Sequence, residues 1–541
     1  MAKIILHGKE AREKLLAGVD AVANAVGCTI GPKGRNVVVG RQYGCPQIIN
    51  DGVSIAKEIE LKDPLENAGA QLLKEVSSKT NDAAGDGTTT ASILAQSITH
   101  EGLKAIDEGA NPVMMKDGIN KAVEVVTNYI KENSLTVDDT MLEQVATVSA
   151  GNNPEIGKLI ADAIKQVGED GVVTVEESNT MGTTLKAAEG LQLDKGYLSP
   201  YFVTDGERME AVLENAYVLC VNKKINLVQD LIPTLEFVAR DGKSLLLIAE
   251  DVEGEALAAL VVNTMRKVLR CIAIKAPGFG DNRKNMLTDI SILTGGTLWT
   301  EEMGIALDQI GGQFFGKASR VVATKDETTI IVDDKTKEAV KTHITLLKKQ
   351  LENMDDDYQK EKIQQRIAKL VGGVAVIQVG APSEVELKER KLRIEDALNA
   401  TKAAKEEGIV PGGGYMLLKA QQECGRDWEC SVARQDYGAG YDLLIKALSL
   451  PAYQIAVNAG KDGDAIIKEC KEKGLGYNAL ADSFENLVET GVIDPAKVTR
   501  SALQNAASVA GMLLTTEASI VDEPNENAES AFAPQGPMPM M

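Results

Sequence analysis

A short segment rich in glycine and threonine, residues 81–90, holds the side chains best suited to chemistry. It reads Asn-Asp-Ala-Ala-Gly-Asp-Gly-Thr-Thr-Thr and lies between two runs with apolar residues at helical spacing. Gly85 and Gly87 let backbone amides approach a ligand closely, and Thr88 opens a helix whose free N–H groups favour a phosphate. Asp86 offers an oxygen ligand for a hard cation such as Mg²⁺. The alternative is an ordinary turn with a threonine N-cap, and this segment alone leaves both open.

Three further loops have the chemistry of a nucleotide site. Residues 29–36 (Thr-Ile-Gly-Pro-Lys-Gly-Arg-Asn) supply amides and a hydroxyl, Asp51 lies between Asn50 and Gly52, and residues 411–414 (Pro-Gly-Gly-Gly) enter a helical run. Each loop alone also fits a plain turn. No Gly-x-x-x-x-Gly-Lys-[Ser/Thr] loop occurs, and no Gly-x-Gly-x-x-Gly opens a helix after a strand, so a nucleotide site would be of another kind.

The two ends of the chain are predicted to be helical. Residues 8–133 carry apolar residues at helical spacing, apart from a turn at 31–34 and a strand at 36–39. Helical patterns return over 141–170 and from 411 to about 516. Because both ends share this character, we expect one discontinuous domain built from them.

The middle of the chain alternates strands and helices, which is typical of an inserted α/β domain. The predicted strands are 172–176, 217–221, 244–249, 271–275, 320–324, 328–332 and 374–379. The predicted helices are 231–239, 254–267, 282–294, a charged pair within 336–369, and a long helix over 384–407. Residues 522–541 are rich in Pro, Asn, Ala and Met and are predicted to be disordered.

Length and charge limit the class of protein. The 541 residues exceed what one core supports and predict about three or four domains. A net charge of -21 argues against nucleic acid and anionic membranes as partners, because phosphate contacts need Lys/Arg patches. No run of about 18 apolar residues occurs, so no membrane span is expected.

Cysteine and histidine usage argues against a metal site or a His-based triad. The closest of the 7 cysteines, Cys424 and Cys430, fit no zinc spacing, which favours free thiols in a reducing compartment. His7, His100 and His343 lie at unrelated positions. The N-terminus lacks the apolar stretch of a signal peptide, so we expect a cytoplasmic protein of a bacterial cytosol, or of a plastid stroma if organelle-encoded.

Taken together, the motifs resemble those of the group I chaperonins, the 60-kDa GroEL-type family. The likeness runs from about Lys3 to Glu517. The matching segments are 29–36, 50–53, 81–90, 275–281 with Arg283 and Lys284, 369–376, 393–397 and 494–502.

The resemblance implies a multi-domain α and α/β fold. The expected domains are a helical equatorial domain (1–133 and 409–541), a small α/β intermediate hinge domain (134–189 and 374–408) and an α/β apical domain (190–373). It also implies a homo-oligomer of two stacked seven-subunit rings. In such rings, non-native polypeptides are enclosed under a 10-kDa-type co-chaperonin in an ATP-driven cycle.

The resemblance further implies an ATP site with Mg²⁺ and K⁺ as cofactors. Thr29 to Pro32 would contact phosphates and help to bind K⁺, Asp86 would ligate Mg²⁺, and Asp494 would hydrogen-bond the ribose. The full expected set is Thr29, Ile30, Gly31, Pro32, Asp86, Gly87, Thr88, Thr89, Thr90, Gly413, Asn478, Ala479, Leu480, Val492 and Asp494.

Two carboxylates are the candidates for hydrolysis. By the resemblance, Asp396 on the long helix would orient and polarise the attacking water, and Asp51 near the γ-phosphate is the second candidate. By the resemblance, Asp396 would lie on the moving intermediate domain, so this domain would close onto the nucleotide before hydrolysis. From the residue alone, an ordinary surface charge near Arg393 and Lys402 is the alternative.

Apolar faces in the inserted domain would carry the second function. The expected residues for substrate and co-chaperonin binding are Tyr197, Tyr201, Phe202, Ile232, Leu235, Leu257, Val261, Val262 and Asn263. By pattern alone, Leu257, Val261 and Val262 form one helix face that fits a core equally well. The resemblance implies that these faces are exposed and bind non-native chains in many copies around a ring.

Some features depart from the family pattern. Asn50 stands where some members have a lysine, residues 529–541 lack Gly-Gly-Met repeats, and residues 423–437 fit poorly and are expected to be a variable loop.

A chaperonin paralogue acting as a holdase or assembly subunit with weak ATPase is the main alternative function. A metabolic kinase is a third, although no substrate pocket beyond ATP is indicated.

Overall fold

The chain forms two compact units. A computed structural model describes residues 2–40, 46–168, 171–178, 182–206, 208–352, 354, 357–425 and 435–523. One unit contains the described residues up to Ala161 and from Ala381 onward, and the other is Asp162–Gly380. The finer division into three domains stays a prediction. The expected tail beyond residue 523 and the central part of the expected loop at 423–437 lie outside the described residues.

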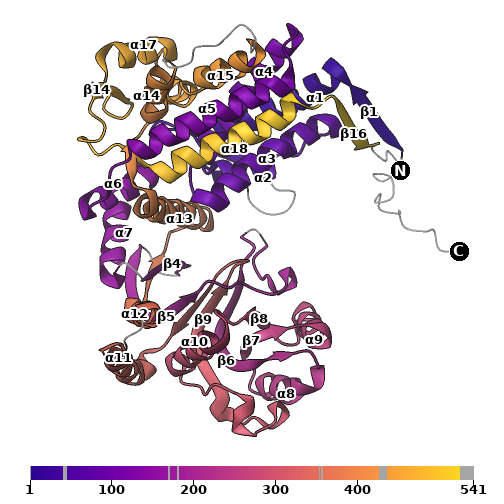
Figure 1. The fold of residues 1–541 in the computed structure, drawn as a ribbon, viewed down its shortest axis with the longest axis vertical. Coiled ribbons are helices and arrows are strands. Elements are labelled where there is room, and N and C mark those ends of the chain that lie inside the picture. The colour runs from indigo at the N-terminus through magenta and orange to yellow at the C-terminus, as the bar shows by residue number, and fades with distance from the viewer. Residues whose placement is uncertain are drawn as a thin grey trace, which may run out of the picture. The chain divides into compact units, whose positions relative to one another are not determined.

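Long helices form the core of the first unit (Figure 1). They are α1 (Gly8–Gly27), α3 (Pro64–Ala84), α4 (Thr88–Asp107), α5 (Pro112–Glu132) and α18 (Ala496–Leu514). α1 and α3 pack with their backbones in contact: a Cβ added to Gly18 would lie 1.8 Å from the carbonyl oxygen of Glu66, and one on Gly69 would lie 2.0 Å from that of Leu15. Glycine is therefore required at this crossing, which fixes the helix that ends at the loop 85–87.

Local sequence signals begin several of these helices. Asp63 and Asn111 each precede a proline and accept hydrogen bonds from the backbone N–H groups of Leu65 (2.9 Å) and Val113 (3.0 Å), respectively. The remaining helices of this unit are α2 (Gly52–Glu58), α6 (Asp139–Ser149), α7 (Pro154–Val167, which continues into the second unit), α13 (Glu384–Glu407), α14 (Tyr415–Cys424), α15 (Gln435–Ala447), α16 (Leu450–Asn458) and α17 (Gly463–Lys473).

Short antiparallel pairs complete the first unit. They are β1 (Lys3–His7) with β16 (Ala518–Asp522), β2 (Val37–Val39) with β3 (Gln47–Ile49), β12 (Ile409–Pro411) with β15 (Ile493–Pro495), and β13 (Gly476–Asn478) with β14 (Ser483–Glu485). The first pair joins the two ends of the described chain, with Lys3 opposite Asp522. The stretch 411–516 is mostly helical, as expected, and β13, β14 and β15 were not predicted, because strands of three residues carry no periodic pattern.

The second unit is built on a mixed sheet of eight strands among the described residues, in the order β4-β11-β5-β10-β9-β6-β7-β8. Their bounds are β4 (Val172–Glu177), β5 (Thr184–Leu193), β6 (Ala211–Ile225), β7 (Ser244–Val252), β8 (Cys271–Lys275), β9 (Phe315–Ala323), β10 (Thr328–Val332) and β11 (Val374–Val379). All seven predicted strands are confirmed. β5 was not predicted, and it pairs antiparallel with both β10 and β11.

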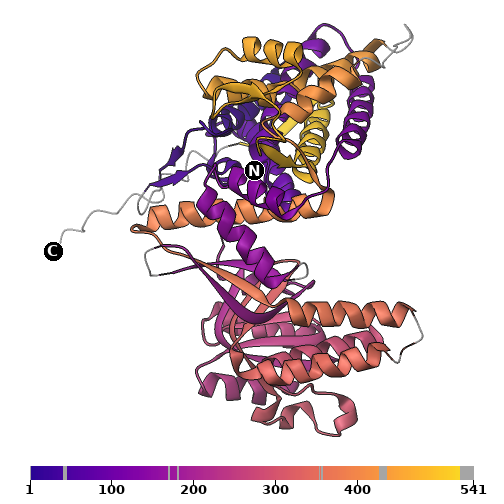
Figure 2. The same cartoon turned by 90° about the vertical axis from the view of Figure 1, so that its left-hand side faces the viewer.

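Helices flank this sheet (Figures 1 and 2). They are α8 (Ile232–Arg240), α9 (Gly254–Met265), α10 (Gly280–Thr294), α11 (Lys337–Glu352) and α12 (Asp357–Gly372), and the last two lie side by side. The core beneath them is mostly aliphatic and includes a stacked aromatic pair, Phe237 and Phe315, whose ring centroids are 4.9 Å apart. Across the described parts of the chain, no helix has the length and apolar character that a membrane span requires.

Candidate functional site

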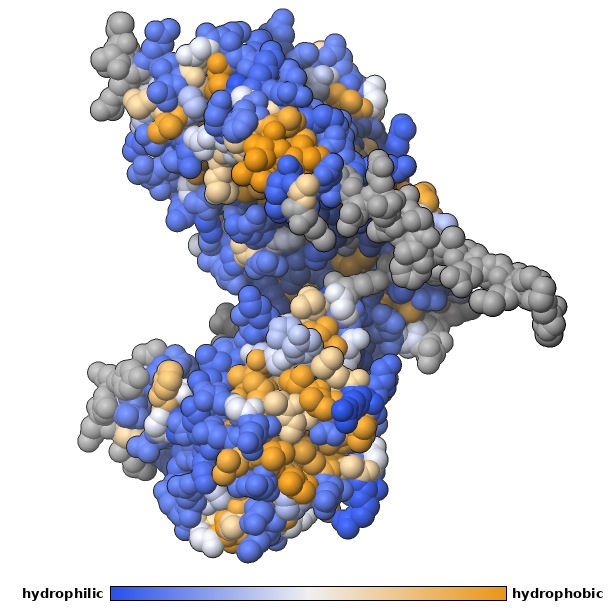
Figure 3. Space-filling view, turned by 90° about the vertical axis from the view of Figure 1, so that its right-hand side faces the viewer, coloured by the Kyte–Doolittle hydropathy of each residue, from blue (hydrophilic) through white to orange (hydrophobic). Residues whose placement is uncertain are grey.

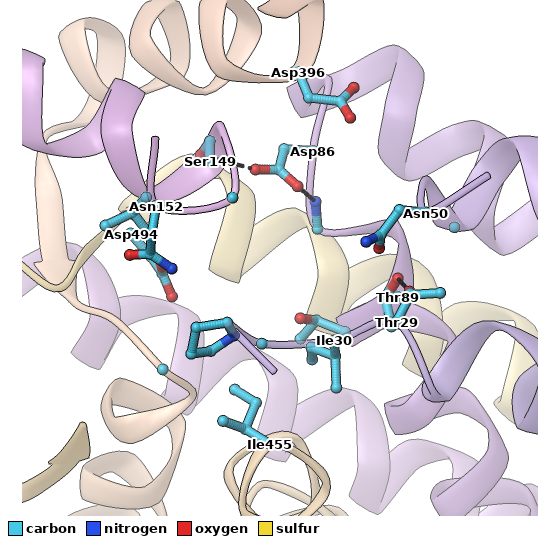
Figure 4. Close-up of a pocket in the computed structure, with 18 of the residues that line it drawn as sticks. Thr29, Ile30, Asn50, Asp86, Thr89, Ser149, Asn152, Asp396, Ile455 and Asp494 are labelled. Atoms are coloured by element: carbon cyan, nitrogen blue, oxygen red, sulfur yellow. Dashed lines mark hydrogen bonds between the residues drawn. The ribbon is translucent and has the colours of Figure 1, made fainter. Parts of the chain in front are cut away.

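A cavity of about 300 Å³ opens within the first unit (Figure 4). Its walls come from α4, α6, α13 and α16 and from loops near both ends of the chain. The structure brings every predicted nucleotide and catalytic residue to this cavity: Thr29, Ile30, Gly31, Pro32, Asp51, Asp86, Gly87, Thr88, Thr89, Thr90, Asp396, Gly413, Asn478, Ala479, Leu480, Val492 and Asp494.

The turn between α3 and α4 forms one wall. Gly85 caps α3 at φ 68°, and Gly87 precedes α4 at φ 80°, conformations that glycine adopts without strain. Gly87 rather than a threonine is the N-cap, and it has no side chain to satisfy the first N–H groups of α4. The helix therefore directs backbone donors and its positive end toward the cavity.

Asp86 is held in place at the centre of this turn. One carboxylate oxygen accepts a hydrogen bond from the backbone N–H of Gly87 (2.5 Å), and the other accepts one from the hydroxyl of Ser149 (3.2 Å) at the end of α6 (Figure 4). Two donors on opposite oxygens fix the orientation of this carboxyl group.

The loop after α1 forms the facing wall. The hydroxyl of Thr29 donates to the carbonyl oxygen of Val26 (2.8 Å) and lies 3.3 Å from the hydroxyl of Thr89. The two glycine-rich segments are thus joined at their threonines, as Figure 4 shows. Asn50 donates to the side-chain oxygen of Asn36 (3.0 Å).

Asp51 has a structural role that its sequence context did not reveal. It is the N-cap of α2 and accepts hydrogen bonds from the backbone N–H groups of Val53 (3.3 Å) and Ser54 (2.9 Å). Its part in hydrolysis stays a prediction.

Burial and mutual repulsion raise the pKa values of the carboxyl groups in the cavity. Burial raises the pKa of Asp494 to about 7, and the charge of Asp86 adds to the rise. Burial also raises the pKa of Asp396 well above its ordinary range, and the charges of Asp51 and Asp86 contribute. The pKa of Asp86 is itself raised, mainly by burial. The cavity therefore gathers carboxyl groups whose ionised forms are disfavoured, and an incoming cation would favour their ionisation.

The β13–β14 hairpin and the glycine run at 412–414 line the far end of the cavity. Asn478 accepts hydrogen bonds from the backbone N–H groups of Leu480 (3.0 Å) and Ala481 (3.1 Å), which folds the β13–β14 hairpin over the cavity. A Cβ on Gly412 would lie 2.9 Å from a carboxylate oxygen of Asp494, so the glycine run lets this carboxyl group approach the backbone.

Sequence reasoning missed several residues that line the cavity. Ser149, Asn152 and Ile455 come from α6, the loop after it and α16 (Figure 4). None stands in a recognisable motif, and only the folding of distant segments brings them to the nucleotide loops.

The structure tests the exposure of the predicted apolar surface in the second unit. Tyr201, Ile232 and Val262 are 63%, 42% and 43% exposed, and Figure 3 shows apolar residues gathered on a face of this unit. Leu235, Leu257 and Val261 are half-buried against the core, and the half-buried Asn263 donates to the carbonyl oxygen of Ala259 (2.8 Å).

The exposure expected for two aromatic residues is wrong. Phe202 is fully buried and Tyr197 is only 8% exposed, and both belong to the core of the second unit. The 3-10 helix Pro200–Phe202 turns Tyr201 outward and Phe202 inward. Phe202 therefore stabilises the unit and presents no surface to a ligand.

Asp494→Asn is expected to stabilise the nucleotide-free protein at pH 8. The native pKa of about 7 exceeds the unfolded value of about 3.9, so the contribution of neutral Asp494 is complete below about pH 4 and is lost as the pH rises to about 7. Asparagine stays neutral throughout. The free energy of unfolding of the variant, relative to that of the wild type, should rise by about 2 kcal/mol between pH 5 and pH 8 in urea unfolding. Asp117→Asn, at an exposed position, is the control and should give no such change. An equal gain in the free energy of unfolding at both pH values would contradict the raised pKa of Asp494.

Comparison with protein families decides the classification. The model of the TCP-1/cpn60 chaperonin family matches residues 22–524. The chain belongs to the TCP-1/cpn60 chaperonin family. The resemblance inferred from the motifs is confirmed at the level of the family.

Solved chaperonin structures share the fold. The chaperonin gp146 from the bacteriophage EL 2 (Pseudomonas aeruginosa), crystallised in the presence of ATP-BeFx, is 21% identical over 96% of this chain and 100% of that one, with a TM-score of 0.67 in crystal form II. Crystal form I gives a TM-score of 0.61 over 96% and 99% of the two chains. The expected multi-domain helical and α/β chaperonin fold is confirmed.

Proposed function

We propose that this chaperonin binds ATP in the cavity of the first unit and uses its hydrolysis to fold non-native proteins. The observation that carries the proposal is that the N-terminus of α4, the Thr29 loop and four aspartates meet at one cavity. The aspartates are Asp51, Asp86, Asp396 and Asp494. The phage chaperonin of the same fold, crystallised with ATP-BeFx, supports a nucleotide as the ligand. The test is ATP-dependent recovery of a denatured enzyme, with ATP turnover measured in parallel.

The residues present fit Mg²⁺ that arrives with the phosphates. Among the described residues, no group of three or more His, Cys, Asp or Glu could hold a metal by itself. Mg²⁺ in nucleotide sites commonly takes one or two carboxylates, and phosphate oxygens supply the rest. Asp86, oriented by two donors and close to other negative charges, would be that ligand and would neutralise phosphate charge through the bound ion. K⁺ would take oxygens of the Thr29 loop.

Chain residues would then share the work of hydrolysis. Thr88 to Thr90 and the Thr29 loop would orient the phosphates, Asp494 would accept a hydrogen bond from a ribose hydroxyl, and the Asn478 hairpin would cover the base. Asp396 would hold the attacking water and accept its proton.

The exposed apolar surface of the second unit would bind non-native chains and the mobile segment of a 10-kDa-type co-chaperonin. Val262→Glu should weaken capture of a denatured protein several-fold, because a carboxylate replaces apolar area that the ligand would bury. Val371→Glu is the matched control, since Val371 is 61% exposed on α12, outside the predicted surface. Pull-down of a denatured labelled protein measures both, and an equal loss in both variants would contradict this location.

Two exposed apolar ribbons support a homo-oligomer. Ile5 and Ile520 on β1 and β16 are 50% and 62% exposed, and Val38 and Ile48 on β2 and β3 are 67% and 44% exposed. Apolar side chains on short ribbons with open edges are suited to subunit contacts. Two stacked rings of seven 57.7-kDa chains would have a mass of about 0.8 MDa, and one ring half of that, which mass photometry separates. We place the assembly in a cytoplasm or plastid stroma.

The alternative is a chaperonin that acts as a holdase or assembly subunit. It would capture denatured protein without appreciable ATP turnover. The presence of Asp51, Asp86 and Asp396 at one cavity favours the active ATPase.

A further inference from the structure

An asparagine outside the cavity ties down the loop that forms its wall. Asn458 is the last residue of α16. Its side-chain amide donates to two backbone carbonyl oxygens, that of Gly27 (3.0 Å) and that of Ile30 (2.9 Å). Gly27 ends α1, and Ile30 belongs to the loop that lines the cavity. One side chain therefore joins a helix end to this loop.

The orientation of this amide is itself fixed. The side-chain oxygen of Asn458 accepts a hydrogen bond from the side-chain amide of Gln454 (2.9 Å), one turn earlier on α16. Both amide protons and the oxygen of Asn458 are therefore engaged, and only this orientation satisfies two carbonyl acceptors and one donor. If the amide were flipped, its oxygen would face the two carbonyl oxygens and both hydrogen bonds would be lost.

The loop depends on such a clamp. The carbonyl of Gly27 is one of the last of α1 and has no partner within the helix. Gly31 turns the chain at φ 87°, and a Cβ there would lie 3.1 Å from a methyl carbon of Ile455, so the loop rests on α16 with little space. Packing against Ile455 fixes the distance of the loop from α16, and the hydrogen bonds of Asn458 fix its position along the helix.

We propose that Asn458 is a positioning residue for nucleotide binding, acting through the Thr29–Pro32 loop. Among the described residues, Asn458 does not line the cavity, so it acts through the Ile30 carbonyl rather than by touching the ligand. The role rests on the proposed ATP function. The loop that it orients would contact phosphates in both the bound and reacting states, while Asp396 is held separately on α13.

The test is Asn458→Ala in the full chain. The expected result is a rise of about tenfold in the ATP Kd and KM, with kcat changed less than about twofold. Without its two hydrogen bonds, each of ordinary strength, the loop would no longer be held in place beforehand, and binding would have to order it. Deuterium exchange of the peptide 27–36 without nucleotide should also become faster, which reports on the loop independently of any ATPase.

Gln421→Ala is the matched control. Gln421 on α14 likewise donates to two helix-end carbonyl oxygens, those of Ile445 (2.8 Å) and Lys446 (3.1 Å), away from the nucleotide loops. It should lower stability without raising KM. Should Asn458→Ala fail to fold, Gln454→Ala removes only the donor that orients Asn458 and should raise KM about two- to threefold.

Three outcomes separate the positioning role of Asn458 from the proposed ATP function. If the wild type binds ATP and Asn458→Ala leaves Kd and KM unchanged, the positioning role is overturned. If KM rises equally in Gln421→Ala, the effect is general destabilisation and the role is also overturned. If the wild type does not bind ATP, the proposed function fails, and unchanged deuterium exchange of 27–36 in Asn458→Ala would overturn the clamp separately.

Discussion

Asp396→Ala is expected to lower ATP turnover by about 10²-fold or more while ATP still binds. The half-buried side chain extends from α13 into the cavity near Asp51 and Asp86. A carboxylate that holds the attacking water and takes its proton contributes about 10²–10⁴-fold to a rate. Binding should persist, because the Thr29 loop and the start of α4 are unchanged by this substitution.

The raised pKa of Asp396 gives this prediction a second part. Burial is the main cause of the rise, and the charges of Asp51 and Asp86 add to it, so the nucleotide-free protein disfavours the ionised form of this carboxyl group. In the loaded site, where the charge of Asp86 is offset, Asp396 is expected to ionise and become a base. Turnover by the wild type should therefore fall at low pH while ATP binding falls less.

Single-turnover hydrolysis and ATP titration measure both quantities. Asp396→Asn keeps the shape of the side chain without its basicity and should resemble Asp396→Ala. Glu395→Ala changes the neighbouring carboxylate, which does not line the cavity, and should retain turnover within about twofold. Full turnover by Asp396→Ala would remove it as the base and leave Asp51 as the candidate.

Much of the site could be predicted because each part is a local motif. Gly85, Gly87 and the threonines that follow them occupy consecutive positions, so their chemistry is visible in the sequence. Ser149 and Ile455 could not be predicted, because each is an ordinary residue on an ordinary helix and reaches the cavity only by tertiary folding. The capping role of Asp51 was missed for a related reason, since it depends on α2 beginning at the next residue.

The strands show the same division between local and tertiary causes. β8 and β10 have the predicted bounds because each is a short run with β-branched residues, two isoleucines in Cys-Ile-Ala-Ile-Lys and all five residues of Thr-Thr-Ile-Ile-Val. β5 reads Thr-Leu-Lys-Ala-Ala-Glu-Gly-Leu-Gln-Leu, with few β-branched residues, and is held extended by partners on both sides. Phe202 was misplaced because an aromatic residue in a short loop carries no pattern that separates a core contact from an exposed one.

Asp289→Ala is expected to destabilise the second unit by about 3 kcal/mol or more. Asp289 on α10 is 4% exposed and accepts two hydrogen bonds from the guanidinium of Arg366 on α12, both 2.7 Å, and one contact of 2.6 Å with His343 on α11. Arg366 is only 9% exposed. Removing the carboxylate leaves a nearly buried cation without its partner, which commonly costs about 3–5 kcal/mol.

The second unit carries its own reporter for this test. Trp299 is 3% exposed within its core, so urea unfolding of the full chain in a Trp428→Phe background would follow this unit alone by fluorescence. Glu302→Ala is the control, because its ion pair with Lys284 joins side chains that are 76% and 39% exposed and should matter little. An equal, small effect of both substitutions would mean that Arg366 reaches solvent when Asp289 is removed. A large effect of Asp289→Ala alone would show that the ion pair with Arg366 and the contact with His343 stabilise the packing of α10 against α11 and α12.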